Sequence, residues 1–305
     1  MNAGTAAPSM TTGPHHRRST CRACGGSALE EILDLGLQPL ANAFPLHPDE
    51  FDAEARYPLA LTLCRDCGLV QLVDVIDPEV LFAHYLYVAG TADAVVTHNQ
   101  AYAATVVELL RLGPGDLVVE TASNDGGLLA CFRDRGVRVL GLDPAANIAE
   151  IAVARGIPTD VVFFGAEEGA RTRARHGPAR AVLGNNVLAH VDDPIGFLAG
   201  ARALLTDDGL AIFEVPWLGA MLDGLVYDTI YHEHLSYFSV TALLRIADSL
   251  DTQHRSRVEQ VVATRMGEAI VLDLVVRDGP SPDDAALLRK ADLFKEEFGF
   301  DLRVT

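Results

Sequence analysis

Positive charge is scarce in this chain. Its 305 residues include 24 Lys and Arg against 42 Asp and Glu, which gives a formal net charge of −18. A chain this acidic repels phosphate backbones and anionic lipid head groups, so we expect neither nucleic acid nor a membrane surface as a partner. An anionic substrate would have to meet local cationic groups. The sequence also lacks a run of about 18 apolar residues and the apolar stretch of a signal peptide, so we expect a cytoplasmic protein. No pattern in the sequence sets the oligomeric state, and we expect a monomer.

Cysteine is scarce as well, with five residues, too few for a disulfide framework in a cytoplasmic chain. Four of them form two pairs, Cys21-x-x-Cys24 and Cys64-x-x-Cys67, and a glycine that permits a tight turn follows each pair. Four thiolates arranged in this way predict a tetrahedral zinc site, which is structural because no coordination position stays open. The alternative is four buried cysteines without a metal. Residues 25–63 exceed the usual separation of about 15–20 residues, so we expect a looped excursion near residues 33–44.

The dinucleotide fingerprint Gly-x-Gly-x-x-Gly is absent where the chain otherwise has a nucleotide-binding layout. An apolar run ends on Glu120, a loop of small residues follows, and a second apolar run ends on Asp143, about 20 residues later. Further strands at 157–164, 181–185 and 209–216 alternate with helices, which predicts a Rossmann-like α/β fold with a largely parallel sheet. Because no loop for a pyrophosphate is present, S-adenosylmethionine (SAM) is favoured over NAD as the ligand.

The segment at 227–239 concentrates groups that transfer protons. In it His232, Glu233 and His234 stand among tyrosines and a phenylalanine. Such a cluster suits a buried acid–base site, and the alternative is an aromatic core segment whose histidines only make structural hydrogen bonds. Similar alternatives stay open for His190, which follows the strand at 181–185, and for Tyr85, since phenols more often serve in packing.

Four units are predicted along the chain. They are a disordered tail at 1–18, a zinc-binding module at 19–80, a cofactor-binding domain at 81–240 and a C-terminal α/β region at 241–305. Within them we expect helices at 98–112 and 240–250, two strands at 258–264 and 269–276, and an amphipathic helix that contains Leu287, Ala291 and Phe294.

The chain resembles a family of SAM-dependent C-methyltransferases that act on nucleotide-linked deoxysugars in bacterial antibiotic pathways. The features that carry the resemblance are the cysteine pairs, Tyr85-x-Tyr87-x-x-Gly90-Thr91, the loop at 120–126, Gly141-Leu-Asp-Pro144, the segment at 186–191, Glu214-Val-Pro, and above all the segment at 227–239. The resemblance implies a Rossmann-like class I methyltransferase domain, an N-terminal zinc-binding module and a shortened C-terminal α/β domain.

By this resemblance, a base removes the proton beside the ketone of a nucleotide-linked 4-keto-deoxysugar, and the carbanion attacks the methyl group of SAM. His234 takes the place of the base, and imidazole suits this step because its pKa lies near working pH. The other residues that the resemblance places around the substrate are Tyr85, His190, Tyr231 and Glu233. Those that it places around SAM are Glu120, Ser123, Asp125, Asp143, Pro144 and Asn186. The zinc site takes no part in catalysis.

Two positions depart from the family pattern. Ala122 stands where the family has glycine, and a positive φ there would cost alanine about 1 kcal/mol or more. The segment Arg265-Met-Gly-Glu268 stands in place of a His-Gly-Gly-Ser turn, in the region expected to hold the nucleotide. Two alternatives therefore accompany the main prediction: methylation of another acidic carbon, such as that of a polyketide-derived acid, and a non-catalytic relative that binds SAM or its product.

Overall fold

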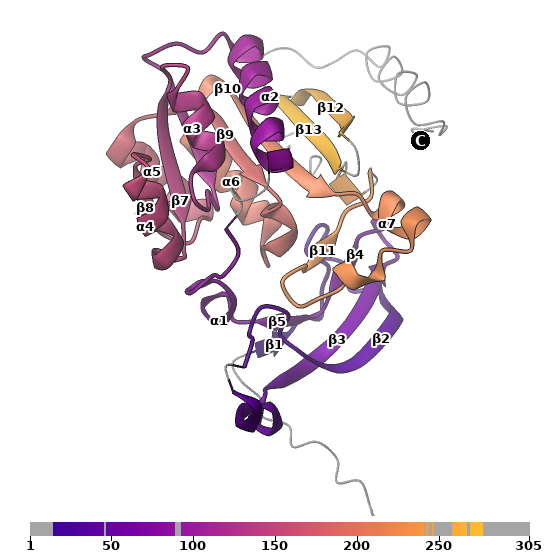
Figure 1. The fold of residues 1–305 in the computed structure, drawn as a ribbon. Coiled ribbons are helices and arrows are strands. Elements are labelled where there is room, and N and C mark those ends of the chain that lie inside the picture. The colour runs from indigo at the N-terminus through magenta and orange to yellow at the C-terminus, as the bar shows by residue number, and fades with distance from the viewer. Residues whose placement is uncertain are drawn as a thin grey trace, which may run out of the picture.

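The structure is a computed structural model that describes residues 15–45, 47–88, 93–240, 242, 243 and 246, and the backbone of residues 258–266 and 269–276. Within these residues the strands form a seven-stranded sheet, a four-stranded sheet and a two-stranded ladder (Figure 1). In Figure 1 the four-stranded sheet lies below the larger one. Residues 1–14 of the expected tail, most of the expected helix at 240–250 and the expected helix at the carboxyl end lie outside the described residues.

The large sheet has the order of a doubly wound α/β fold, as predicted. Its strands, in spatial order, are β12 (Val258–Met266), β13 (Ala269–Val276), β10 (Leu205–Pro216), β9 (Ala179–Asn185), β6 (Leu117–Thr121), β7 (Arg138–Asp143) and β8 (Thr159–Val161). Neighbouring strands from β10 to β8 are parallel, whereas β13 is antiparallel to β10. The chain runs outward from β6 to β8 and then in the other direction from β9, so the carboxyl ends of β6 and β9 open the crevice in which such folds bind ligands.

Helices pack on both faces of this sheet because its strands are apolar on both sides. They are α2 (Asp93–Leu110), α3 (Gly127–Arg133), α4 (Ala146–Ala154), α5 (Ala166–His176) and α6 (Pro194–Leu204). Val118 of β6 packs with α2 and α3, whereas its neighbours Leu117 and Val119 pack with α6, as the alternation of side chains along a strand requires. Glycines let α5 and α6 approach, since a Cβ on Gly169 would lie 2.0 Å from the carbonyl oxygen of Gly200.

The cysteine pairs lie at one end of the antiparallel four-stranded sheet. Its strands, in spatial order, are β11 (Ser236–Tyr237), β4 (Val70–Leu72), β3 (Arg56–Cys64) and β2 (Leu29–Pro39). The first pair lies before β2 and the second at the turn from β3 to β4. The insert between the cysteine pairs is therefore largely a hairpin of β2 and β3, with the 3-10 helix η1 (Pro48–Ala53) in the connection. The sequence analysis expected a loop here. The hairpin forms because Leu59 and Leu61 of β3 pack against Val70 and Leu72 of β4 in a hydrophobic core separate from that of the large sheet.

Residues 15–17 are part of the fold, which corrects the expected end of the tail at residue 18. They form β1 (His15–Arg17), which pairs antiparallel with β5 (Asp74–Ile76). Nη1 of Arg17 lies 2.7 Å from Oδ2 of the buried Asp74. The backbone ladder and this ion pair together hold the segment in place.

Two other segments cross the expected domain boundaries. β11, from the segment at 227–239, adds to the sheet of the cysteine pairs, and Leu235 and Tyr237 pack into the core of that sheet. β12 and β13 form the expected hairpin, but β13 pairs with β10 and so extends the large sheet instead of starting a separate C-terminal domain. This pairing satisfies an edge of β10 that would otherwise be open.

Short helices carry the remaining segments around the crevice. They are α1 (Pro78–Phe82), η3 (Leu188–His190), α7 (Leu218–Gly224) and η4 (Tyr227–Thr229). α1 follows β5 and leads to the linker at 83–88, which crosses from the cysteine module (residues 15–76) to the large sheet (Figure 1). None of the described helices is both long enough and apolar enough to cross a bilayer.

Candidate active site and metal site

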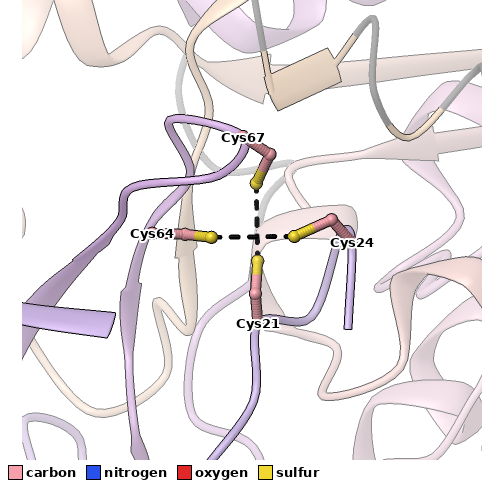
Figure 2. A group of neighbouring side chains, drawn as sticks. All are labelled: Cys21, Cys24, Cys64 and Cys67. Atoms are coloured by element: carbon pink, nitrogen blue, oxygen red, sulfur yellow. Dashed lines mark hydrogen bonds between the residues drawn. The ribbon is translucent and has the colours of Figure 1, made fainter. Parts of the chain in front are cut away.

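The two cysteine pairs converge on one point, as their spacing predicts (Figure 2). Their four Sγ atoms all lie within 4.8 Å of one another. Cys21 Sγ lies 3.5 Å from Cys67 Sγ, and Cys24 Sγ lies 3.6 Å from Cys64 Sγ. Sulfurs about 2.3 Å from a central zinc ion stand about 3.8 Å apart in a tetrahedron, so the cluster fits zinc closely. All four positions belong to thiolates, and the site is structural.

Glycines shape both knuckles of this site. Gly25 and Gly68 have φ angles of 71° and 76°. Their N–H groups donate to the carbonyl oxygens of Cys21 and Cys64, respectively. Because this left-handed region favours glycine, the residue type after each cysteine pair follows from the turn that brings the thiolates together.

A cavity of about 830 Å³ lies at the carboxyl ends of β6, β7 and β9. Its walls come from the large sheet, from the linker after α1 and from the cysteine module. Glu120 and Asp143 line it, and so do Tyr231 and His234. A cavity of this size lies within the usual range for ligand sites, and it joins carboxylates at the strand ends to the histidine segment in one space.

The loop between β6 and α3 follows a strained backbone path. The φ angle is 51° at Ala122 and 49° at Asn124, both in the left-handed region. Asp143 supports the loop: its Oδ2 accepts from the N–H of Asn124 at 2.8 Å, and its Oδ1 accepts from the N–H of Ala145 at 2.9 Å. Ala122 therefore has the positive φ that the sequence analysis identified as costly for alanine.

Asp125 anchors this loop to its neighbours. Its Oδ1 accepts from the N–H of Gly127 at 3.1 Å, at the start of α3. Its Oδ2 forms an ion pair with Arg155, at the end of α4. Although Asp125 lines the cavity, its carboxylate mainly holds the loop to α3 and α4.

Three buried polar atoms around the crevice have no hydrogen-bond partner within the described protein: Glu120 Oε2, Ser123 Oγ and Asn185 Oδ1. All three residues line the cavity. Burial, with Asp143 and Asp125 nearby, raises the pKa of Glu120 well above its usual value. Since buried polar groups normally pair, these atoms fit a ligand that carries hydroxyl and ammonium groups, as SAM does.

His234 is held in one tautomer at the cavity wall. Its Nδ1 lies 2.8 Å from the carbonyl oxygen of Thr229, which can only accept, so Nδ1 carries the proton. Nε2 is then an acceptor, and the hydroxyl of Tyr231 donates to it at 2.8 Å. Burial lowers the pKa of His234, and the bond to Thr229 opposes this only in part. The result is a neutral imidazole with a basic nitrogen.

His190 lies beside His234, from the short helix η3. Its ring centre is 4.9 Å from that of His234 and 5.8 Å from that of Phe82. Burial, and then the proximity of His234, lowers the pKa of His190 to about 3. His190 therefore lines the cavity as a neutral ring, close to where the resemblance placed it.

Glu233 lies elsewhere than expected. It is 3% exposed and is not among the described residues that line the cavity. The hydroxyl of Tyr85 donates to its Oε2 at 3.2 Å, and Nδ2 of Asn42 donates to its Oε1 at 2.5 Å. Tyr85 and Asn42 form the wall in its place. The expectation that Glu233 lines the site is thus corrected: a buried carboxylate needs donors, and these stand between it and the cavity.

The linker is fixed over the cavity by two asparagines. Asn147 of α4 accepts from the N–H of Tyr85 at 3.3 Å and donates to its carbonyl oxygen at 2.8 Å. Asn124 donates to the carbonyl oxygen of Tyr87 at 2.9 Å. The backbone of Tyr85 is therefore fixed by Asn147 of α4, and its hydroxyl group is fixed by Glu233.

The remaining predicted residues are placed as follows. Pro144 and Asn186 line the cavity together with Glu120, Ser123, Asp125 and Asp143. His232 is 1% exposed and points away, with Nε2 3.3 Å from the carbonyl oxygen of Tyr57 in the cysteine module. This histidine is structural.

Sequence reasoning missed several residues of the cavity. His98 of α2 and Glu214 of β10 line it, and Nε2 of His98 lies 3.0 Å from Oε2 of Glu214. Both elements were predicted, but nothing in either indicates that they meet across the crevice. Phe163 and Phe164 also line the cavity, after β8, and the sequence analysis assigned them to a strand at 157–164. Asn42 has no signal in the sequence beyond its place in the insert.

Two family models match the chain. The one described as "Methyltransferase domain" matches residues 96–253, more than half of the chain. The one described as "Putative zinc binding domain" matches residues 21–82, which contain all four cysteines of the metal site.

Individual proteins are also similar to the chain. It is 42% identical over 229 residues to the C-methyltransferase NovU of Streptomyces niveus, a match that covers 75% of this chain and 54% of NovU, so the chain spans about half the length of that relative. Among solved structures, the plantazolicin methyltransferase BpumL with SAH has a TM-score of 0.46 at 9% identity, covering 62% of this chain and 91% of that chain. Magnesium protoporphyrin IX methyltransferase (ChlM) from Synechocystis PCC 6803 with SAM has a TM-score of 0.41 at 16% identity, covering 61% and 82%.

Proposed function

The chain belongs to the methyltransferase domain family, and from this membership we propose that it is a SAM-dependent C-methyltransferase acting beside the ketone of a nucleotide-linked 4-keto-deoxysugar. The observation that carries the proposal is the neutral pair of His234 and Tyr231 in the same cavity as the strand-end carboxylates Glu120 and Asp143. The identity to a C-methyltransferase over most of the chain supports carbon as the acceptor atom.

The carboxylate end of the cavity suits SAM, which would supply a methyl group on a positively charged sulfur. Asp143 stands at the end of β7, where acids of this fold class accept from ribose hydroxyls. The unpartnered atoms of Glu120, Ser123 and Asn185 would receive the remaining polar groups of the ligand. Acidic side chains in a buried site also favour a cation over a neutral ligand. Pro144 and Asn186 would complete this part of the wall.

His234 would act as the general base. Its Nε2 would take the proton from the carbon beside the ketone, and the electrons of that C–H bond would pass into an enolate. The Nδ1–H group would keep donating to the carbonyl oxygen of Thr229 and so stabilise the imidazolium that forms. In the free protein the lone pair of Nε2 accepts from Tyr231, so the phenol would first turn from Nε2 to the ketone oxygen of the substrate. This turn frees Nε2 for the proton and leaves the phenol donating to the enolate oxygen as it forms.

The described walls of this cavity offer the substrate's diphosphate no Lys or Arg side chain. In these walls Asp192, Asp193 and Glu214 add to the acids already named. This favours, as a second candidate, a keto substrate that lacks a diphosphate, such as a polyketide-derived acid or ester. A nucleotide-linked sugar would have to place its diphosphate outside these described walls.

A transfer assay with two probes separates the candidates. The probes are a dTDP-linked 4-keto-6-deoxyhexose and a neutral β-keto ester, each incubated with SAM labelled in its methyl group. The proposal predicts label on a carbon of the sugar, at the position next to the ketone, as located by NMR. Label in the keto ester alone would favour the second candidate. Calorimetric binding of S-adenosylhomocysteine (SAH) without transfer to either probe would contradict both and favour a non-catalytic relative.

A further inference from the structure

Asn42 connects the cysteine module to the active site. It lies between β2 and η1, in the insert that separates the two cysteine pairs, and its side chain lines the cavity. Its Nδ2 donates to Oε1 of Glu233 at 2.5 Å, across 191 residues of chain. A module whose metal is structural thus places a polar side chain at the site of the chemistry.

Glu233 accepts from two residues of the cavity wall. Asn42 donates to one carboxylate oxygen and the hydroxyl of Tyr85 to the other, at 3.2 Å. Burial raises the pKa of Glu233, while the bonds from Asn42 and Tyr85 act in the opposite direction. A buried carboxylate keeps its charge only while such donors are present. The three residues therefore form one hydrogen-bonded unit, in which Asn42 and Tyr85 line the cavity and Glu233 lies behind them, away from the cavity.

We propose that Asn42 is a positioning residue for methyl transfer: it holds Glu233 as an acceptor, and Glu233 in turn fixes the hydroxyl of Tyr85 at the cavity wall. This inference rests on the proposed function, because it concerns the same cavity. Without Asn42, Glu233 would lose a donor and take up a proton more readily. A protonated carboxyl can donate to Tyr85 instead of accepting from it, so the phenol would lose the acceptor that orients it.

A second contact fixes the module against the same site. Arg22 lies between the first two cysteines, its side chain is 0% exposed, and its Nε lies 3.1 Å from Oδ1 of Asp192. Asp192 follows η3, the short helix that carries His190. The ion pair joins the first cysteine knuckle to the loop after η3 and so fixes the orientation of the cysteine module over the cavity. Because Asn42 belongs to this module, its position at the cavity wall is fixed as well.

An exchange of the two side chains tests the role of Asn42. In Asn42→Asp a second carboxylate faces Glu233, and the two must share a proton. The double variant Asn42→Asp/Glu233→Gln restores one amide and one carboxylate in exchanged positions, and its glutamine still offers Tyr85 an acceptor oxygen. Each variant is assayed for methyl transfer to the dTDP-linked 4-keto-6-deoxyhexose, for SAH affinity and for bound zinc. Asp52→Ala, an exposed position in η1 of the same insert, is the matched control.

The expected loss of turnover is about 10-fold for Asn42→Ala and about 100-fold for Asn42→Asp, with the double variant within about 10-fold of the wild type. SAH affinity and zinc content stay at wild-type values, which separates positioning from loss of fold. Asn42→Ala at the wild-type rate, or a double variant no faster than Asn42→Asp, would overturn the inference. Asp52→Ala keeps the wild-type rate.

A failure of the inference about Asn42 can be told apart from a failure of the proposed function. A wild-type protein that binds SAH but transfers no methyl group to the probe counts against the proposed function. The link through Asn42 is then read from melting temperatures of Asn42→Ala, Glu233→Ala and the double variant. If the double variant lowers the melting temperature by less than the sum of the two single variants, the link is supported. Strictly additive decreases in melting temperature overturn it.

Discussion

The imidazole rings of His190 and His234 lie 4.9 Å apart in an edge-to-face arrangement. Each ring is largely withdrawn from water, and a positive charge on one opposes a charge on the other. Burial lowers the pKa of both, and for His190 the neighbouring His234 adds to the effect. The pair is therefore neutral at neutral pH, and Nε2 of His234 can take a proton once the hydroxyl of Tyr231, which donates to it, turns away.

The first prediction concerns the pH dependence of turnover. A base works only in its unprotonated form, so activity is lost as pH falls through its pKa. Because burial sets the pKa of His234 below the ordinary value of 6.5, the acid limb of the kcat profile should lie below pH 6.5. Initial rates measured at saturating substrate across this range check it. An acid limb centred above pH 7 would contradict the assignment, since histidine would then be stabilised as a cation.

The second prediction concerns stability in acid. The pKa of His190 is about 3 in the folded chain, below its ordinary 6.5, so the unfolded chain binds the proton more readily. Its contribution is fully present above pH 6.5 and is lost as pH falls towards 3, with a slope of at most about 1.4 kcal/mol per pH unit. His190→Asn should flatten the fall of the unfolding free energy, measured with urea, between about pH 6 and pH 4. The same change at the exposed His84 should leave the slope as it is.

The third prediction concerns Ala122, whose φ is 51°. Glycine there would remove a strain of about 1–2 kcal/mol and add about 0.4–1 kcal/mol of chain entropy to the unfolded state. Ala122→Gly should therefore raise the unfolding free energy by about 0.5–1 kcal/mol. Ala104→Gly, at an exposed position of α2, should lower it by about 0.5–1 kcal/mol. Equal destabilisation by both changes would mean that Ala122 carries no backbone strain.

The fourth prediction concerns the metal site. Cys24→Ser should release zinc, because a hydroxyl is a much poorer ligand than a thiolate, and should lower the melting temperature. Cys131→Ser, outside the cluster, should keep one zinc ion per chain and serves as the control. Zinc is counted by elemental analysis of the purified protein. A wild-type protein that contains no zinc and does not gain stability when zinc is added would refute the site.

Much of the fold could be predicted because its signals are local. The buried run that ends on Glu120 and the second that ends on Asp143 have the length and spacing of neighbouring parallel strands, and the structure pairs them directly. Each cysteine pair likewise carries its signal within a short segment, a Cys-x-x-Cys followed by glycine. Each of these signals lies within a few consecutive residues.

What could not be predicted depends on contacts between distant segments. β11 is only two residues long, Ser236–Tyr237, and becomes a strand because β4 is there to pair with it. The hairpin of β12 and β13 has a clear strand pattern, but the pattern does not say that β13 joins β10. In the site, Glu233 was expected at the cavity wall. Its place behind Asn42 and Tyr85 depends on the fold of the cysteine module, which the motif itself does not contain.

The central claim, that His234 is the base, is tested most directly by solvent exchange. In D2O with SAH bound, NMR follows the loss of the proton beside the ketone of the dTDP-linked 4-keto-6-deoxyhexose, so that proton abstraction is seen without methyl transfer. The wild type is predicted to exchange this proton, and His234→Ala to exchange it at least about 100-fold more slowly at unchanged SAH affinity. Exchange by His234→Ala at the wild-type rate would contradict the account.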